Sequence, residues 1–187
     1  GMITDVALMN LLKFAEVRSI DVSAYEGADF VLDLNNPDAA ESLGRKFQFV
    51  FDGGTVEHVF HLPNALKNIY TLLEVDGCIL HMSPVSNYVD HGFYQFSPTL
   101  FHDYYLANGF TILDSTCFQH DRFDINAPYN FVPYAPGDFD KFSFGGFDDK
   151  MYGIAFLARK NNKSTWNAVP QQSYYVRRWK SARKSSK

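Results

Sequence analysis

Aspartate residues lie near the ends of two apolar runs of the sequence, where buried strands would end. Asp21 lies near the end of the run 17–22, and Asp33 precedes Leu34 at the end of the run 28–34. A carboxylate at the first place could accept hydrogen bonds from both hydroxyls of a ribose. At the second place it could accept from the amine of an adenine, while Leu34 packs against the ring. The pair indicates a nucleoside site, although either acid alone is also typical of a cap or a turn.

Histidines at the expected strand ends could take a proton from a substrate. We name His58 and His91 as candidate catalytic bases. His81, at the end of another apolar run, is equally well explained as a satisfied, partly buried residue. His58 and His61 are three positions apart and could hold a metal ion, but no third ligand is evident, so the sequence predicts no metal site.

Polar and aromatic residues follow His91 and could line a substrate pocket. Tyr94, Gln95 and Phe96 belong to a segment that follows an expected strand and would lie over the ligand-binding edge of the sheet. We therefore name them as candidate substrate-binding residues. An ordered loop, held in place by Phe93 and Phe96, explains the same pattern equally well.

Strands and helices alternate along most of the chain. Apolar runs predict strands, and 3.6-residue periodicity predicts helices. The expected strands are 17–22, 28–34, 47–51, 78–82, 110–118 and 151–159, and the expected helices are 4–16, 56–73 with a break at Pro63, and 100–108. This order predicts an α/β domain with an open, mainly parallel, Rossmann-like sheet, helices on both faces, and a C-terminal antiparallel strand pair. The long connection 119–148 is expected to form a lid or a cleft wall.

Several blocks of this sequence resemble the class I S-adenosylmethionine-dependent methyltransferases. The blocks are SIDVS at 19–23, ADFVLDLNNP at 28–37, FVFDGGTVEHV at 49–59, ALKNIYTLLEVDGCILHMSP at 65–84 and NGFTIL at 108–113, and the resemblance covers roughly residues 5–118. It implies S-adenosylmethionine as the cofactor, with its ribose on Asp21, its adenine on Asp33 and Leu34, and its methionine part beside Asp52, Gly53 and Gly54.

One block of that family is missing from this sequence. The family opens with a strand and a glycine-rich turn that lies against the methionyl part of the cofactor, and no such segment precedes the expected helix 4–16. The sheet should therefore contain a gap about 4.8 Å wider than normal pairing allows. Either the strands 17–22 and 47–51 pair directly, or another chain closes the gap in a homo-oligomer.

The C-terminal residues form a basic, aromatic extension. Nine of the 17 Lys and Arg residues, and none of the 21 Asp and Glu residues, lie in 159–187. We expect a domain over 1–160 and an extension over 161–187 that either contacts nucleic acid or folds back on the acidic body. No apolar stretch is long enough to span a membrane, and no signal peptide is evident, so we expect a cytoplasmic protein without a membrane partner.

These observations favour a methyltransferase-like enzyme that acts on a small molecule or a glycan. Methyl transfer from a sulfonium requires mainly orientation and sometimes a base, so no fixed catalytic motif is expected. The missing glycine-rich block leaves an alternative, a non-catalytic binding module that has lost the donor site. A third reading is an adaptor that binds nucleic acid or another anionic surface through its basic extension.

Overall fold

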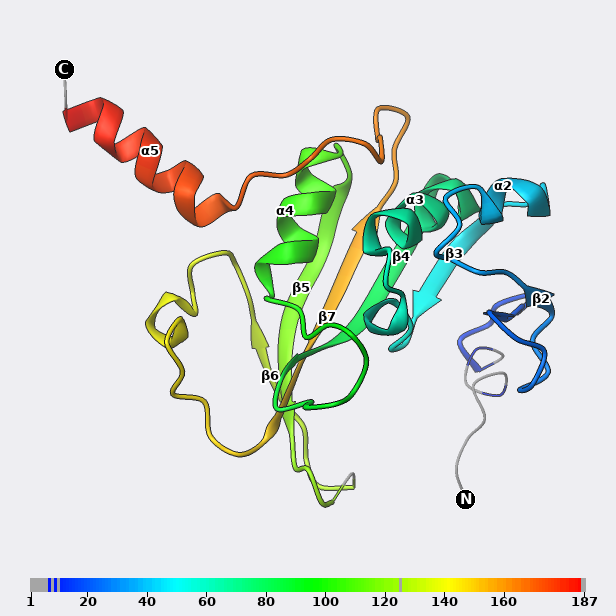
Figure 1. Cartoon of the computed structure of the whole chain (residues 1–187), viewed down its shortest axis with the longest axis horizontal. Helices are drawn as coiled ribbons and strands as arrows, with labels where there is room; N and C mark the ends of the chain where they lie inside the picture. The colour runs from blue at the N-terminus through cyan, green and yellow to red at the C-terminus, as the bar shows by residue number, and fades with distance from the viewer. Residues whose placement is uncertain (1–6, 8, 10, 125, 186–187) are drawn as a thin grey trace.

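A five-stranded mixed sheet forms the centre of the protein, as a computed structural model shows for residues 7, 9, 11–124 and 126–185 (Figure 1). The strand order is β3-β4-β7-β5-β6. The strands are β3 (Phe47–Asp52), β4 (Leu73–Ser86), β5 (Thr111–His120), β6 (Asn130–Pro133) and β7 (Met151–Arg159). The pair β3–β4 is parallel, whereas β4–β7, β7–β5 and β5–β6 are antiparallel. The α/β class is confirmed, but the prediction of a mainly parallel, Rossmann-like sheet is wrong.

The position of β7 explains this difference. The strand expected at 151–159 is present and pairs antiparallel with β5, as predicted. It also lies beside β4 and runs antiparallel to it, so it separates β4 from β5. An apolar run such as that of β7 indicates a buried strand but does not specify its direction.

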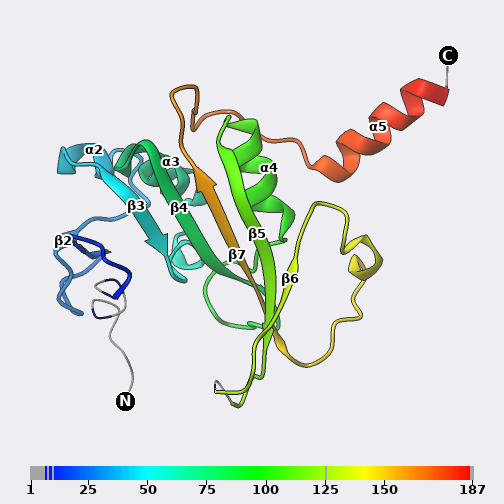
Figure 2. The ribbon, with the colours of Figure 1, turned by 180° about the vertical axis from the view of Figure 1, so that it is seen from behind.

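The helices that pack on the sheet lie on one face. Figure 1 shows α3 (Leu62–Leu72) and α4 (Thr99–Ala107) in front of the strands, and Figure 2 shows the strands in front of these helices. The short helix α2 (Ala39–Leu43), which the sequence did not predict, lies beside α3. Of the expected helix 4–16, residues 4–6, 8 and 10 lie outside the described part of the chain. Ala7, Met9 and Leu11 are helical, and the chain has already turned at Lys13, whose φ is 64°. Helices on both faces are therefore not found in the part of the chain that the structure describes.

The first two strands form a small sheet of their own. β1 (Ile20–Asp21) and β2 (Phe30–Val31) pair in parallel and are shorter than the expected 17–22 and 28–34. Side chains fix their ends, because Asp29 accepts hydrogen bonds from the backbone and hydroxyl of Ser19. Within the described residues β1 does not pair with β3, so direct pairing does not close the expected gap. Closure by another chain stays a prediction.

The core lies between the inner faces of α3 and α4 and the sheet. Its largest fully buried side chains with apolar rings or chains come from α4, β4 and β7, and they include Phe101, Tyr105, Leu73, Ile79, Ile154 and Phe156. The predicted helix 56–73 is interrupted, as expected, but at 59–61. A 3₁₀ turn, η1 (Val56–His58), precedes α3, and Pro63 lies in the first turn of α3, where its missing N–H costs nothing.

The C-terminal extension begins as a packed segment and ends as a projecting helix. Asn108 holds the segment to the domain, because it donates to the carbonyl of Ala168 and accepts from the hydroxyl of Thr165. The basic helix α5 (Ser173–Ser185) then extends away from the sheet (Figure 1). Within the described residues, no helix is both long and apolar enough to cross a membrane. A role in nucleic-acid binding stays a prediction.

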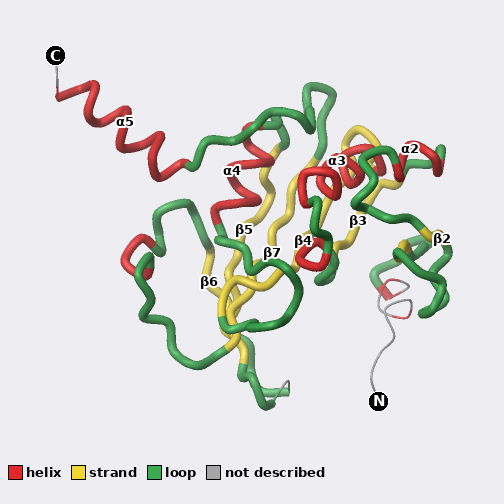
Figure 3. The backbone as a smooth tube through the Cα atoms, viewed as in Figure 1, coloured by secondary structure: helices red, strands yellow, loops and turns green. Residues whose placement is uncertain are grey.

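A long loop between β6 and β7 contains one short element. Figure 3 shows this loop as an extended excursion from the sheet, and it includes the 3₁₀ turn η2 (Asp140–Phe142). Arg177 of α5 donates to the carbonyl of Pro136 in this loop and lies 3.6 Å from the carboxylate of Asp140. The loop therefore contacts the basic helix, and its predicted function as a lid remains untested.

Asn68 joins the segment after β2 to the helix that follows β3. Its buried amide donates to the carbonyls of Leu34 and Asn36, and its oxygen accepts from the N–H of Ala40 at 2.9 Å. The N–H of Ala40 is buried, and the two carbonyls lie in part-buried contacts. Asn68 thus places the carboxyl end of β2 against α3.

We predict that Asn68→Ala lowers the free energy of unfolding by about 1–3 kcal/mol, because the buried N–H of Ala40 loses its acceptor and two part-buried carbonyls lose a donor. Urea denaturation measures this loss. Asn162→Ala, at an exposed asparagine, serves as the control and should have no effect. Equal stability of the two variants would contradict the proposed role of Asn68.

Candidate functional site

A chain of buried polar side chains connects β3, β4 and α4. His81 Nδ1 lies 2.5 Å from Asp52 Oδ2, and His81 Nε2 lies 2.7 Å from the hydroxyl of Tyr105. All three side chains are buried, and the His81 ring stacks on Phe101 with 4.3 Å between centroids. A neutral imidazole satisfies every group, since Nδ1–H then donates to the carboxylate and Nε2 accepts from Tyr105. Burial raises the pKa of Tyr105 well above its ordinary value, which keeps this hydroxyl protonated.

Asp52 also positions the turn that follows β3. Its second oxygen, Oδ1, accepts hydrogen bonds from the N–H groups of Thr55 and Val56, at 2.9 and 3.2 Å. These bonds hold the chain as it enters η1, whose residues are Val56, Glu57 and His58. The turn directs Glu57 into the protein and leaves His58 exposed. Asp52 therefore determines where both side chains lie.

Glu57 is a buried carboxylate without a full set of partners. The residue is 1% exposed, and Oε2 has no hydrogen-bond partner within the described part of the chain. Oε1 lies 3.9 Å from Nε2 of His91, a half-exposed side chain. Burial raises the pKa of the Glu57 carboxyl, and the nearby charge of Asp52 adds to the rise. Such an unpaired buried group calls for a ligand or an explanation.

The loop that carries His91 is attached to the backbone of Glu57. The carbonyl of Glu57 accepts hydrogen bonds from the N–H groups of Phe93 and Tyr94, at 2.7 and 3.2 Å. Gly92 has a φ of 78°, and a Cβ there would approach the Glu57 carbonyl oxygen to 2.8 Å. Only glycine fits this close approach. The loop thus brings His91 to Glu57 from more than 30 residues further along the chain.

The predicted substrate-binding residues are held by contacts within the protein. The Tyr94 hydroxyl donates to the carbonyl of Phe60, and the Gln95 side chain accepts from the N–H of Tyr88. Phe96 is buried in the core. These are the contacts expected if the segment is an ordered loop rather than the lining of a substrate pocket. Substrate binding by Tyr94, Gln95 and Phe96 stays a prediction.

The acids of β1 and β2 lie at adjacent strand ends. Asp21 pairs with Val31 in the register of the two strands, and the carbonyl of Asp21 accepts a hydrogen bond from the N–H of Leu32. Asp33 therefore lies two residues beyond the partner of Asp21. Asp21 Oδ1 accepts from the N–H of Ser23, and Asp33 Oδ1 accepts from the backbone and side chain of Asn35. The Oδ2 atoms of both acids make no hydrogen bond within the described residues.

The segment after β2 contacts the start of α3. Asn35 accepts a hydrogen bond from the N–H of His61, and its carbonyl accepts from the side chain of Asn64, at the start of α3. Leu34 packs against the core beside these contacts. Gly54 follows β3 with a φ of 95°, and a Cβ there would lie 3.2 Å from Glu57 Oε1. Gly53 likewise leaves space for the Phe51 ring.

The residues present fit one half of S-adenosylmethionine better than the other. At neighbouring strand ends, Asp21 and Asp33 use Oδ1 in hydrogen bonds within the protein, and Oδ2 of each makes none within the described residues. Asp52, which the resemblance places beside the methionine part, uses both oxygens inside the protein. The methionine half therefore lacks the expected partner, and we derive no methyl-transfer step from this site.

Sequence reasoning missed the main contacts of this region. Glu57 stood beside His58 in the sequence, and this adjacency was the available signal for a shared site. Tyr105 gave no signal, because its spacing within α4 is that of an ordinary core residue. His61, considered as a partner of His58, packs edge-on against Phe60 and occupies the N-cap position of α3 without a side-chain capping bond.

Comparisons with known proteins give a distant resemblance of fold. No family model matches this sequence, and no curated protein matches it. Among solved structures, the chain is similar to TehB from Haemophilus influenzae, with a TM-score of 0.45 and 14% sequence identity. The match covers 85% of this chain and 48% of the TehB chain, so the chain spans about half the length of that structure.

We predict that His81→Phe destabilises the protein by about 3–5 kcal/mol, because Asp52 then keeps a buried charge without its partner. Tyr105→Phe should cost less, about 1–2 kcal/mol, since it leaves only one imidazole nitrogen unpaired. Urea denaturation of both variants tests this order. Tyr25→Phe, at a tyrosine that is 93% exposed, is the control. A His81→Phe variant as stable as the unmodified protein would refute the stabilising role of the hydrogen-bonded residues Asp52, His81 and Tyr105.

Proposed function

We propose that this protein is a methyltransferase-like domain that binds an adenine nucleoside, such as the nucleoside part of S-adenosylmethionine. The observation that carries the proposal is the pairing of β1 with β2, which sets Asp21 and Asp33 at adjacent carboxyl ends with one oxygen of each uncommitted. Asp21 would accept from the ribose hydroxyls, and Asp33 from the adenine amine. Leu34 would pack against the base.

In the enzyme form of this proposal, the acceptor is a small molecule or a glycan near the loop 88–96. His58 and His91 are exposed and could receive the proton that the acceptor loses. They come from different elements and lie close together, with 5.0 Å between ring centroids. A base at this place would need the donor methyl group nearby, which requires a complete cofactor site.

A second candidate function is a binding module without transferase activity. The observation in its favour is the internal use of Asp52, whose oxygens accept from Thr55, Val56 and His81. A module of this kind would hold the nucleoside and leave the methionine part in solvent. The two candidates therefore differ in what the methionine part adds to affinity.

Calorimetry with adenosine, cytidine and S-adenosylmethionine tests the proposal. We expect adenosine to bind more tightly than cytidine, and Asp21→Asn to weaken adenosine binding at least tenfold. The asparagine keeps the acceptor for Ser23 but places an amide where the ribose needs an acceptor. Glu26→Ala, which removes an exposed acid from the same segment, is the control and should bind as the unmodified protein does.

The same titrations separate the two candidates. Tenfold tighter binding of S-adenosylmethionine than of adenosine would support the enzyme, whereas equal binding would support the module. The nucleoside site itself would be rejected if adenosine did not bind at millimolar concentration. It would also be rejected if Asp21→Asn bound adenosine as well as the control.

A further inference from the structure

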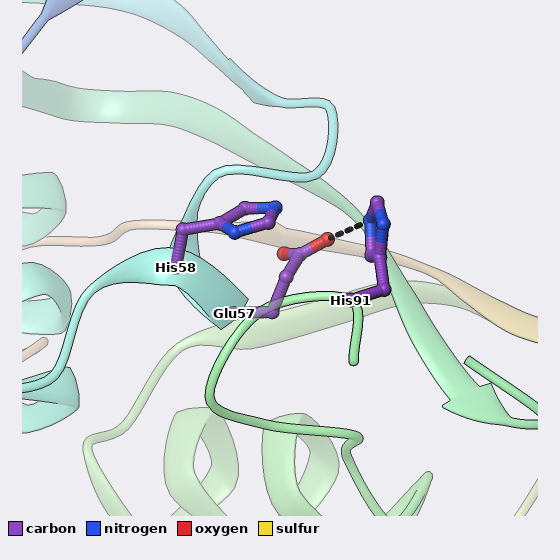
Figure 4. A group of neighbouring side chains, drawn as sticks. All are labelled: Glu57, His58 and His91. Carbon is purple, nitrogen blue, oxygen red and sulfur yellow. Dashed lines mark ion pairs between the residues drawn. The ribbon is translucent and has the colours of Figure 1, made fainter. Parts of the chain in front are cut away.

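Glu57, His58 and His91 form a compact cluster of possible metal ligands. One ligand atom from each residue lies within 4.8 Å of the others. Figure 4 shows the Glu57 carboxylate between the two imidazole rings, with the ion pair to His91 on one side. Two of the residues belong to η1 and the third to the loop after β4, so the fold assembles the cluster from separate segments.

We propose that Glu57, His58 and His91 bind a divalent transition-metal ion such as Zn²⁺. The cluster combines two imidazole nitrogens with one carboxylate oxygen, a donor set that suits Zn²⁺, Fe²⁺, Co²⁺ or Ni²⁺. Three protein ligands leave at least one coordination position open. That position would take water or an oxygen-bearing ligand.

The unpaired oxygen of Glu57 is an independent observation that points to a ligand. Oε2 is buried and has no hydrogen-bond partner among the described residues, although a buried carboxylate normally has several. The carbonyl of Glu57 accepts hydrogen bonds from the N–H groups of Phe93 and Tyr94, which hold the residue in this buried place. A bound cation would compensate the charge that the fold keeps in this place.

The geometry requires only a small movement of exposed side chains. Donors on a tetrahedral Zn²⁺ lie about 3.4 Å apart when the bonds are about 2.1 Å long. The present separations reach 4.8 Å, so His58 and His91 would move inward by about 1 Å. Both rings are exposed enough to rotate, since the His91 side chain is 52% exposed. Glu57 is fixed by burial and provides the anchor.

The site would discriminate between kinds of cation. Mg²⁺ prefers oxygen ligands in octahedral geometry and retains its water, so two imidazole ligands suit it poorly. The proposal uses none of the residues of the proposed nucleoside site, which are Asp21 on β1 and Asp33 and Leu34 just after β2. It is an alternative to the role of His58 and His91 as bases, because a ring nitrogen that binds a metal ion has no lone pair for a proton. Either site can fail its test without affecting the test of the other.

Metal titration of the full chain, free of any histidine tag and treated first with a chelator, tests the proposal. We expect calorimetry to show one Zn²⁺ per chain with a dissociation constant in the micromolar range or below. A tenfold excess of Mg²⁺ should not compete. Co²⁺ should give visible absorption of a tetrahedral or five-coordinate site, which Zn²⁺ then removes.

Variants of the ligands identify the site. His58→Ala and His91→Ala should each weaken Zn²⁺ binding at least tenfold, and both positions are exposed, so folding should persist. His61→Ala is the matched control, because His61 is an exposed histidine of the same segment that lies outside the cluster. Glu57→Gln should weaken binding as well, after circular dichroism has established that it folds.

Three outcomes would overturn the proposal. The unmodified protein could fail to bind Zn²⁺ at 100-fold the protein concentration. It could bind no more tightly than a His58→Ala, His91→Ala double variant. Loss of binding in His61→Ala equal to that in His58→Ala would assign the ion to surface histidines instead.

Discussion

The burial of an aspartate, a histidine and a tyrosine in one hydrogen-bonded chain is the constraint on which the structure depends. Asp52, His81 and Tyr105 come from β3, β4 and α4, and none of them reaches water. Burying a carboxylate is costly unless its oxygens are satisfied, and both oxygens of Asp52 accept hydrogen bonds when these elements meet in one register. The core around Phe101 and Phe156 packs on this polar chain.

The same aspartate links the interior to the surface cluster. Because Oδ1 of Asp52 holds the N–H groups of Thr55 and Val56, the turn η1 starts at a fixed place and brings Glu57 inward. The Glu57 carbonyl in turn receives the loop of His91. The family resemblance places Asp52 beside a cofactor. In the structure, Asp52 instead helps to bring Glu57, His58 and His91 together.

Local sequence patterns predicted where the main strands lie in the sequence. They did not predict the order and direction of the strands in the sheet. The apolar runs at 47–51 and 151–159 became β3 and β7, since a short apolar run bounded by turn residues is typical of a strand. The direction of β7 depends on partners distant in the sequence, so no local pattern contained it. His58 and His91 were recognised singly as candidates. Their contact depends on the close approach at Gly92, which appears only in the folded chain.

The central place of β7 has a consequence for synthesis on the ribosome. Its residues Ile154, Phe156 and Ala158 fill the middle of the sheet, yet they emerge after β3, β4 and β5. Until then, β4 and β5 have no neighbour to join them, and each exposes an unpaired edge. The central part of the sheet can therefore form only after β7 has been synthesised. Folding of the sheet then comes late in synthesis and depends on contacts between residues that are distant in the sequence.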